Sequence, residues 1–147
     1  MVQCFKLLCK NVCVSVEQIS RNIYVTKHMF LSFGGRTHAG IPGEQVDRAT
    51  FDGRRGVVAH AYFPSDGRIH FDEDEKWSFS GRRGGWWLWR YTDAESMVWV
   101  ATHEIGHALG LGHSTVRGTV MWPTVSLGNP ALHRDDVAGI RALYRCK

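Results

Sequence analysis

The sequence lacks any long apolar run and carries few cysteines. No stretch approaches the ~20 consecutive apolar residues of a membrane helix, so the sequence predicts no membrane span. It also contains no internal repeat and no low-complexity stretch, which argues against a repeat architecture. With 147 residues, 44% of them hydrophobic and 22% charged, the chain has the length and composition of one globular domain.

The four cysteines do not define a disulfide framework. Cys4, Cys9 and Cys13 lie near the start, whereas Cys146 lies near the end. An even number permits disulfides, but their pairing cannot be read from sequence. A metal site made by the first three has no fourth ligand, and Cys146 is expected to pair within a downstream module.

Acidic residues are fewer than basic ones. The 14 acidic and 18 basic side chains leave a net charge of +4. Such a charge favours anionic matrix or membrane surfaces. A nucleic-acid partner is not predicted. Only the basic charge would support such a partner, and the sequence contains no recognition motif.

One segment carries the most specific pattern in the chain. Residues 103–113 read H-E-x-x-H-x-x-G-x-x-H, and Met121 follows downstream. A bare H-E-x-x-H match arises by chance, but here a glycine, a third histidine and a methionine also lie at the required offsets. The pattern therefore predicts the zinc site of a peptidase.

The spacing explains why these residue types suit a metal. On a helix, His103 and His107 lie on one face because they are four residues apart. Glu104 sits at the edge of that face, where it reaches a metal-bound water without ligating the metal. Gly110 lets the chain leave the helix, and the chain then returns His113 as the third ligand. Three protein ligands leave one position open, as in catalytic rather than structural sites. The alternative reading is three histidines that merely fill a core or surface, but such groups need partners when buried.

The same helix has a predicted beginning and a predicted buried face. Residues 92–95 (Thr-Asp-Ala-Glu) form a capping-box pattern ahead of an apolar run. The apolar face at helical spacing consists of Val98, Ala101, Ile105 and Ala108.

Around the motif, Ser114 follows the last histidine, and residues 120–123 read Val-Met-Trp-Pro. This segment resembles the metzincin peptidases and, within them, the matrix metalloproteinases. The resemblance implies an α+β fold, in which a twisted mixed sheet carries an active-site helix and a C-terminal helix. It also implies that Met121 forms an apolar floor under the zinc, and that Asp135 and Asp136 match a pair bracing the methionine turn.

An upstream match implies a second, structural zinc. Residues 51–53, 59–64 and 70–77 follow the family's order of motifs. By resemblance, the ligands of this zinc are His38, His60 and His70. The family's fourth ligand, an aspartate, is replaced by Gly40, and either Glu44 or Asp47 could substitute for it. The alternative is that the three histidines are ordinary polar residues of strands and loops.

The resemblance further implies a calcium site. Its side-chain ligands would be Asp52, Asp72 and Glu75, whose oxygen atoms suit a hard cation. Backbone carbonyls near residues 53–57 would complete the site, although Arg55 stands where the family usually has glycine. The alternative is a solvated acidic turn.

The activity implied is zinc-dependent hydrolysis of internal peptide bonds, with Glu104 as general base and then general acid. The substrate would lie extended beside an edge strand. The predicted substrate-contacting residues are Val58, Ala59, Trp122, Pro123 and Val125. The rival readings are a catalytically inert zinc-binding interaction module and an incomplete fragment. Resemblance also implies an extracellular location, matrix-protein substrates and a tissue-inhibitor-type protein inhibitor.

Residues 1–32 do not resemble the family, so we divide the chain into an atypical segment (1–32) and a peptidase domain (33–147). The family's first strand and first long helix are expected to be absent or replaced. Long stretches at 38–51 and 77–92 and the ending Leu143-Tyr144-Arg145-Cys146 resemble the cysteine-array matrix metalloproteinase.

The remaining patterns predict individual elements. Strands are expected at 23–33, 54–63 and 67–72, and a short helix at 15–23. A hairpin with a glycine-rich turn is expected at 76–90. A last helix would be capped by Asp135. Its expected apolar face consists of Val137, Ile140, Leu143 and Tyr144.

Overall fold

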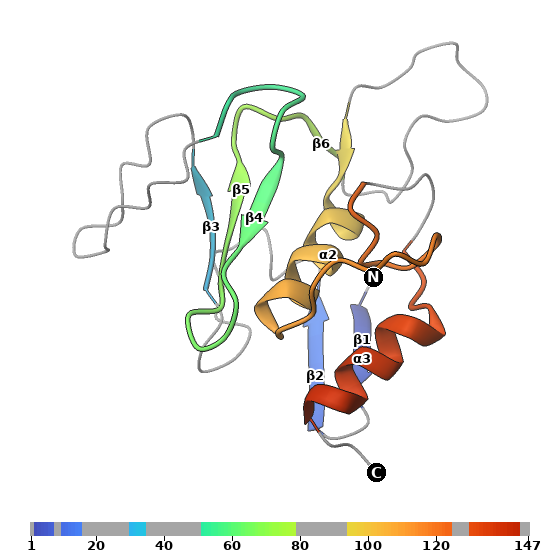
Figure 1. Cartoon of the computed structure of the whole chain (residues 1–147). Coiled ribbons are helices and arrows are strands. Elements are labelled where there is room, and N and C mark those ends of the chain that lie inside the picture. The colour runs from blue at the N-terminus through green and yellow to red at the C-terminus, as the bar shows by residue number, and fades with distance from the viewer. Residues whose placement is uncertain are drawn as a thin grey trace.

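The described part of the chain combines three small sheets with two helices (Figure 1). The computed structural model describes residues 2–7, 10–15, 30–34, 51–78, 94–124 and 130–144. Helix α2 lies between the three-stranded sheet and helix α3, as Figure 1 shows. This mixed arrangement agrees with the predicted α+β class.

The three-stranded sheet is mixed, as expected. Its strands are β3 (Phe30–Gly34), β4 (Ala59–Ala61) and β5 (Arg68–Asp72), and their order is β3-β5-β4. The central strand β5 pairs in parallel with β3 and antiparallel with β4. Successive side chains of a strand point to opposite faces, and the four from Ile69 to Asp72 are all buried. Both faces of β5 are therefore covered, and β4 is an edge strand of the sheet that the described residues form.

Two further sheets have two strands each. Strands β1 (Val2–Leu7) and β2 (Lys10–Ser15) form an antiparallel hairpin in which Cys4 is the register partner of Cys13. Strands β6 (Trp77–Ser78) and β7 (Glu95–Ser96) pair in parallel. The first half of the predicted 76–90 hairpin thus pairs with residues 95–96, and residues 79–90 lie outside the described part.

Helix α2 (Met97–Ala108) begins later than the capping box at 92–95 predicted. Ser96 is the N-cap, and its Oγ accepts a hydrogen bond from Trp99 N at 3.3 Å. Glu95 belongs to β7, so it cannot serve as the third residue of a capping box. Because the strand continues to residue 96, the first side chain that can cap the free N–H groups is that of Ser96.

The core forms between α2 and the sheet. Its buried members are Ile69, Phe71, Met97, Val100, Ala101, Ile105 and Ala108. The predicted face was right for Ala101, Ile105 and Ala108, but Val98 is only half-buried. Met97 and Val100 are buried in its place, because the helix begins at Met97 and its first turn already packs on the sheet.

Helix α3 (Arg134–Tyr144) begins one residue before the predicted cap, so Asp135 lies in the first turn. The predicted apolar face is also only partly right. Val137 and Ile140 are half-buried, whereas Leu143 and Tyr144 are 52% and 48% exposed. The last turn of α3 meets the turn that follows α2, through Tyr144 and Leu143, and much of these two side chains stays in solvent.

The other predicted elements are shorter than expected. The strand at 67–72 is confirmed as β5, but that at 54–63 is reduced to β4, because residues 54–56 form a turn. The predicted 23–33 strand overlaps β3 at 30–33, and residues 23–29 lie outside the described part. Ser15 ends β2 rather than starting a helix, and 16–23 also lie outside. Neither described helix has the length and apolar character to cross a membrane.

Candidate metal centre

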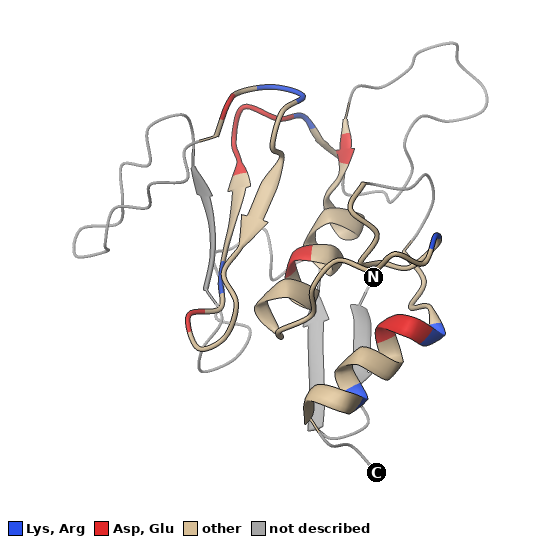
Figure 2. Ribbon diagram, in the orientation of Figure 1, with Lys and Arg blue, Asp and Glu red and all other residues tan. Residues whose placement is uncertain are grey.

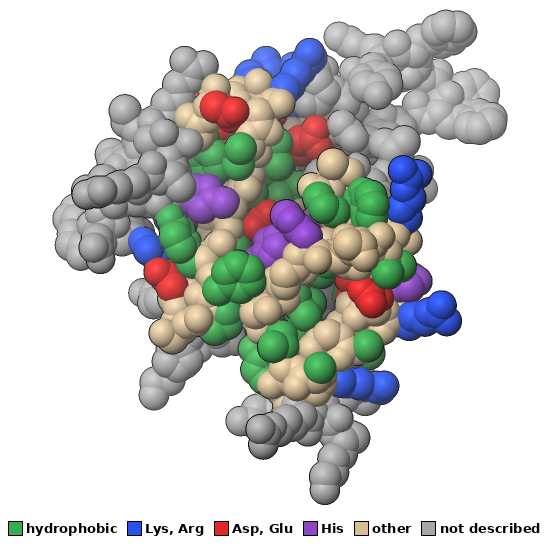
Figure 3. All heavy atoms as spheres, viewed as in Figure 1, with side chains coloured by type: hydrophobic (Ala, Val, Ile, Leu, Met, Phe, Trp, Pro, Cys, Tyr) green, Lys and Arg blue, Asp and Glu red, His purple; other side chains and the backbone are tan. Residues whose placement is uncertain are grey.

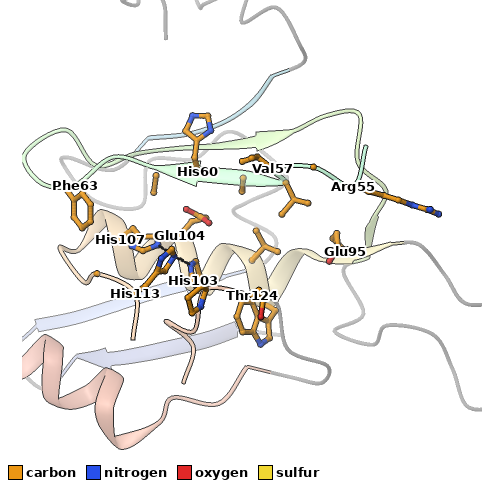
Figure 4. A pocket seen from close by; sticks show the side chains of 18 residues that line it. Arg55, Val57, His60, Phe63, Glu95, His103, Glu104, His107, His113 and Thr124 are labelled. Carbon is orange, nitrogen blue, oxygen red and sulfur yellow. Dashed lines mark hydrogen bonds between the residues drawn. The ribbon is translucent and has the colours of Figure 1, made fainter. Parts of the chain in front are cut away.

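Three histidine side chains meet at one point beside the sheet (Figure 4). The Nε2 atom of His107 lies 3.1 Å from those of both His103 and His113, and the last two are 3.3 Å apart. Nitrogens bound to one zinc at about 2.0–2.1 Å in tetrahedral geometry lie about 3.3 Å from one another. The three nitrogens therefore fit one zinc ion with a fourth position free.

Backbone carbonyls orient two of these rings. His103 Nδ1 lies 2.6 Å from Val120 O, and His107 Nδ1 lies 2.7 Å from Leu111 O. A carbonyl only accepts, so each Nδ1 carries the proton and each Nε2 presents its lone pair. Burial lowers the pKa of His103 to about 4 and also lowers the pKa of His107. Both rings are thus held in the neutral form that binds a metal.

Glu104 lies beside the histidines, and its side chain is 7% exposed. Its Oε2 atom has no hydrogen-bond partner among the residues that the structure describes, and burial raises the pKa of the carboxyl group to about 7. Figure 4 shows Glu104 between the histidines and β4, facing the cleft. A buried carboxyl without a partner is costly for stability, which is typical of a group retained for chemistry.

The turn after α2 carries the chain to the third histidine as predicted. Gly110 has φ +102°, a conformation that glycine adopts at little cost. Gly110 N donates to His107 O at 2.8 Å, and Leu111 N donates to Gly106 O at 2.9 Å. This pair of bonds is a Schellman motif, which reverses the chain and returns His113 to the site.

Met121 packs against α2 at Gly106, and its role as a floor under the zinc stays a prediction. Met121 is 2% exposed, and a Cβ atom added at Gly106 would overlap its sulfur. Gly106 lies on α2 between His103 and His107. The absence of a side chain there lets the methionine approach the helix directly.

We expect Gly106→Ala to destabilise the protein by about 1–3 kcal/mol, because Met121 must move in a packed site. The change would otherwise stabilise a helix by about 1 kcal/mol. Thermal unfolding measures the effect. Gly112→Ala is the control, since an added Cβ there meets no atom within 4 Å. Adding Met121→Ala to Gly106→Ala should recover part of the stability that the overlap with the Met121 side chain costs. If none is recovered, the overlap does not explain the loss of stability.

The first turn of α3, red in Figure 2, carries two aspartates, Asp135 and Asp136, that bond to the segment between His113 and Met121. The buried Asp136 carboxylate accepts hydrogen bonds from the backbone N–H groups of Val120, Met121 and His133, at 2.8–3.2 Å. Asp135 accepts from Ser114 Oγ at 2.7 Å. Because Val120 O orients His103, Asp136 fixes a metal ligand through one intervening residue.

A cleft of about 1030 Å³ runs past the histidines and along β4. Figure 3 shows histidine and acidic side chains gathered in this hollow, with apolar side chains around them. Of the predicted substrate-contacting residues, Val58, Ala59 and Pro123 line the cleft. Trp122 is not among its lining residues; it lies instead under the Arg117 guanidinium, 5.7 Å from the ring centre. Val125 lies outside the described part.

Two aromatic residues of the cleft were missed by the sequence reasoning. Trp99 stacks on His103 with ring centres 5.6 Å apart, and Phe63 meets His107 edge-on at 5.8 Å. Trp99 precedes His103 by four residues on one helix, so the helical spacing itself could have identified it. No sequence pattern connects Phe63 with His107, because the sheet brings them together.

The residues of the predicted structural zinc are only partly described. His60 and His70 are register partners on β4 and β5, and their ring centres are 5.1 Å apart. Tyr62 meets both rings edge-on, at 5.8 and 6.0 Å. His38, Gly40, Glu44 and Asp47 lie outside the described part. The sheet thus brings two of the three predicted ligands together.

The predicted calcium ligands surround the loop at 53–57. Asp52 Oδ1 accepts from Val57 N at 2.8 Å, and Glu75 accepts from Arg55 N. Asp72 is fully buried, and within the described part of the chain its Oδ2 atom has no hydrogen-bond partner. Among the described residues, however, only the three histidines of the first site place three ligand atoms within 4.8 Å of one another. Arg55 has φ +69°, which explains why a glycine suits this position.

Comparison with known proteins agrees with this geometry. The sequence model of the matrixin family matches residues 23–145, so the chain belongs to the matrixin family, whose members depend on zinc. The chain is similar to the hatching enzyme of Paracentrotus lividus, with 43% identity over 116 residues, 78% of this chain and 17% of that protein.

Two further relatives are a plant and a human protein. The Arabidopsis thaliana metalloendoproteinase 2-MMP is 44% identical over 69% of this chain and 27% of its own length. Human matrix metalloproteinase-20 is 43% identical over 69% of this chain and 20% of its own length. The matched region is thus well under a third of each of these relatives. The nearer resemblance to the cysteine-array member stays a prediction.

Proposed function

We propose that this chain is a zinc-dependent endopeptidase. The observation that carries the proposal is the convergence of three histidine Nε2 atoms beside the buried Glu104, in a cleft open along β4. Bound at this site, zinc would make its water a nucleophile near neutral pH and polarise the substrate carbonyl. The names of the relatives, a hatching enzyme and metalloendoproteinases, support the same activity.

The protein side chains have separate tasks in this reaction. His103, His107 and His113 would hold the metal, and the carbonyls of Val120 and Leu111 keep two of them correctly oriented. Glu104 would take a proton from the attacking water and deliver it to the leaving amine. No side chain needs to form a covalent bond with the substrate.

The substrate would bind as an additional strand. Among the described strands, β4 pairs only with β5, and residues of β4 line the cleft. An extended peptide can pair with such an edge through main-chain hydrogen bonds, which accommodates many sequences. Val58 and Ala59 would contact its backbone, and Pro123 with Val125 would wall the pocket for the residue after the cut.

The location and partners are proposed from the family. The proposed substrates are extracellular matrix proteins, the proposed location is extracellular, and a tissue-inhibitor-type protein would bind the cleft. An inert zinc-binding module is disfavoured, because it has no use for a buried Glu104 whose Oε2 atom has no partner among the described residues. Secretion of a tagged chain from cultured cells tests the location, and retention inside the cells would contradict it.

The experiment is cleavage of an internally quenched peptide with blocked ends. Purified protein should cleave it, a zinc chelator should abolish cleavage, and added zinc should restore it. Mass spectrometry of the products should show a cut between two internal residues. A folded, zinc-loaded protein that leaves a panel of collagen-like and unrelated peptides intact would refute the proposal.

Two further metal sites are proposed. The unpartnered Asp72 Oδ2 supports a calcium ion bound by Asp52, Asp72 and Glu75. Calcium should then raise the melting temperature of the protein and of a Glu73→Gln control, but not of Asp72→Asn.

The facing His60 and His70 support a structural zinc completed by His38. Metal analysis should find two zinc ions per chain in the wild-type protein and one in the His70→Ala variant. A single zinc ion per chain in both proteins would contradict this site.

A further inference from the structure

The last two turns of α3 contact the turn through which α2 ends. The Tyr144 hydroxyl donates a hydrogen bond to Leu109 O at 3.0 Å. The last carbonyls of a helix have no partner within the helix. Tyr144, which lies 35 positions after Leu109 in the chain, therefore supplies a hydrogen-bond donor for the Leu109 carbonyl.

The same turns of α3 also pack against the next residues. A Cβ atom added at Gly139 would lie 2.7 Å from Leu111 Cδ2, so the absent side chain makes room for Leu111. Leu143 Cδ1 would lie 3.4 Å from a Cβ at Gly110. Helix α3 thus contacts three consecutive residues of the turn, one through a hydrogen bond and two through packing.

This turn determines how a zinc ligand points. The Leu111 carbonyl holds His107 Nδ1 at 2.7 Å, and a displacement of Leu111 would rotate the imidazole ring. Groups that hydrogen-bond metal-binding histidines typically change metal affinity 10–100-fold when they are lost. Contacts that hold such a group act on the metal through it.

We propose that Gly139 and Tyr144 are positioning residues for His107, which act on zinc binding through the turn at Leu109–Leu111. The inference rests on the zinc site of the proposed function. Helix α3 then orients two ligands from its two ends. Asp136 acts on His103 through Val120, and Gly139 and Tyr144 act on His107 through Leu111.

The first test is Tyr144→Phe, which removes only the hydroxyl group. Its zinc dissociation constant, measured by competition with a chelator of known affinity, should rise roughly 3–10-fold. The substitution should lower the melting temperature of the zinc-loaded protein more than it lowers the melting temperature of the zinc-free protein. Arg141→Ala is the matched control, because Arg141 is an exposed residue of α3. Its zinc affinity should equal that of the wild type.

The second test is a pair of variants at Gly139. Gly139→Ala should weaken zinc binding by pushing Leu111, and Gly139→Ala with Leu111→Ala should bind zinc more tightly than Gly139→Ala alone. Unchanged zinc affinity in Tyr144→Phe, or equal losses of melting temperature with and without zinc, would overturn the proposal. Tyr144→Phe decides the question even where Gly139→Ala does not fold.

Zinc binding is measured here without any substrate, so the two proposals fail separately. A wild-type chain that binds zinc but cleaves no peptide would refute the peptidase function and leave the affinity comparison decisive. A chain that cleaves peptides, and whose Tyr144→Phe variant binds zinc as tightly as the wild type, would refute the positioning role alone.

Discussion

Replacing Glu104 with glutamine is expected to lower kcat about 10²–10⁴-fold, the usual contribution of a general acid–base group. Glutamine has nearly the same size and shape but cannot accept the proton of the attacking water. KM should change much less, because Glu104 forms no part of the β4 edge that would hold the substrate backbone. Steady-state cleavage of the quenched peptide measures both constants.

The controls for Glu104→Gln separate chemistry from folding. The variant should bind zinc with wild-type stoichiometry and should unfold at the same or a higher temperature, since it no longer buries an unpartnered carboxyl group. Glu73→Gln removes a similar group from the exposed β5–β6 turn and should keep wild-type kcat. A Glu104→Gln protein with full activity would show that another group moves the proton.

Replacing Asp136 with alanine is expected to cost about 3–5 kcal/mol of stability. The change leaves the N–H groups of Val120, Met121 and His133 without their acceptor, and each unsatisfied buried donor costs about 1–3 kcal/mol. Equilibrium unfolding in urea measures the loss. Zinc affinity should fall as well, because Val120 O also orients His103.

The neighbouring aspartate provides the matched control. Asp135→Ala removes an exposed carboxylate that accepts only the Ser114 hydroxyl and should cost less than about 1 kcal/mol. Asp136→Asn should lie between the two, because its one remaining oxygen cannot accept from all three N–H groups. Equal losses in Asp135→Ala and Asp136→Ala would contradict the bracing role of Asp136.

How much of the site could be predicted depended on how far apart its residues lie in the chain. The three zinc ligands, Glu104 and Gly110 fall within eleven consecutive residues. Helical periodicity places His103, Glu104 and His107 together, and the local turn at Gly110 adds His113. The roles of Met121 and Asp136 were predicted from family resemblance; in the structure Met121 packs against Gly106, and Asp136 accepts a hydrogen bond from Met121 N. The predicted beginning of α2 was wrong, because Glu95 belongs to strand β7 and Ser96 caps the helix instead.

The sequence by itself determined the metal-binding chemistry, because H-E-x-x-H is a local pattern and an α-helix has a fixed period. Tertiary structure alone decided which carbonyl orients His103, that the Phe63 ring flanks His107, and where β4 borders the cleft. These features join segments that are distant in the chain. Such segments meet only when the core between α2 and the sheet forms, and no local preference of the backbone encodes that meeting.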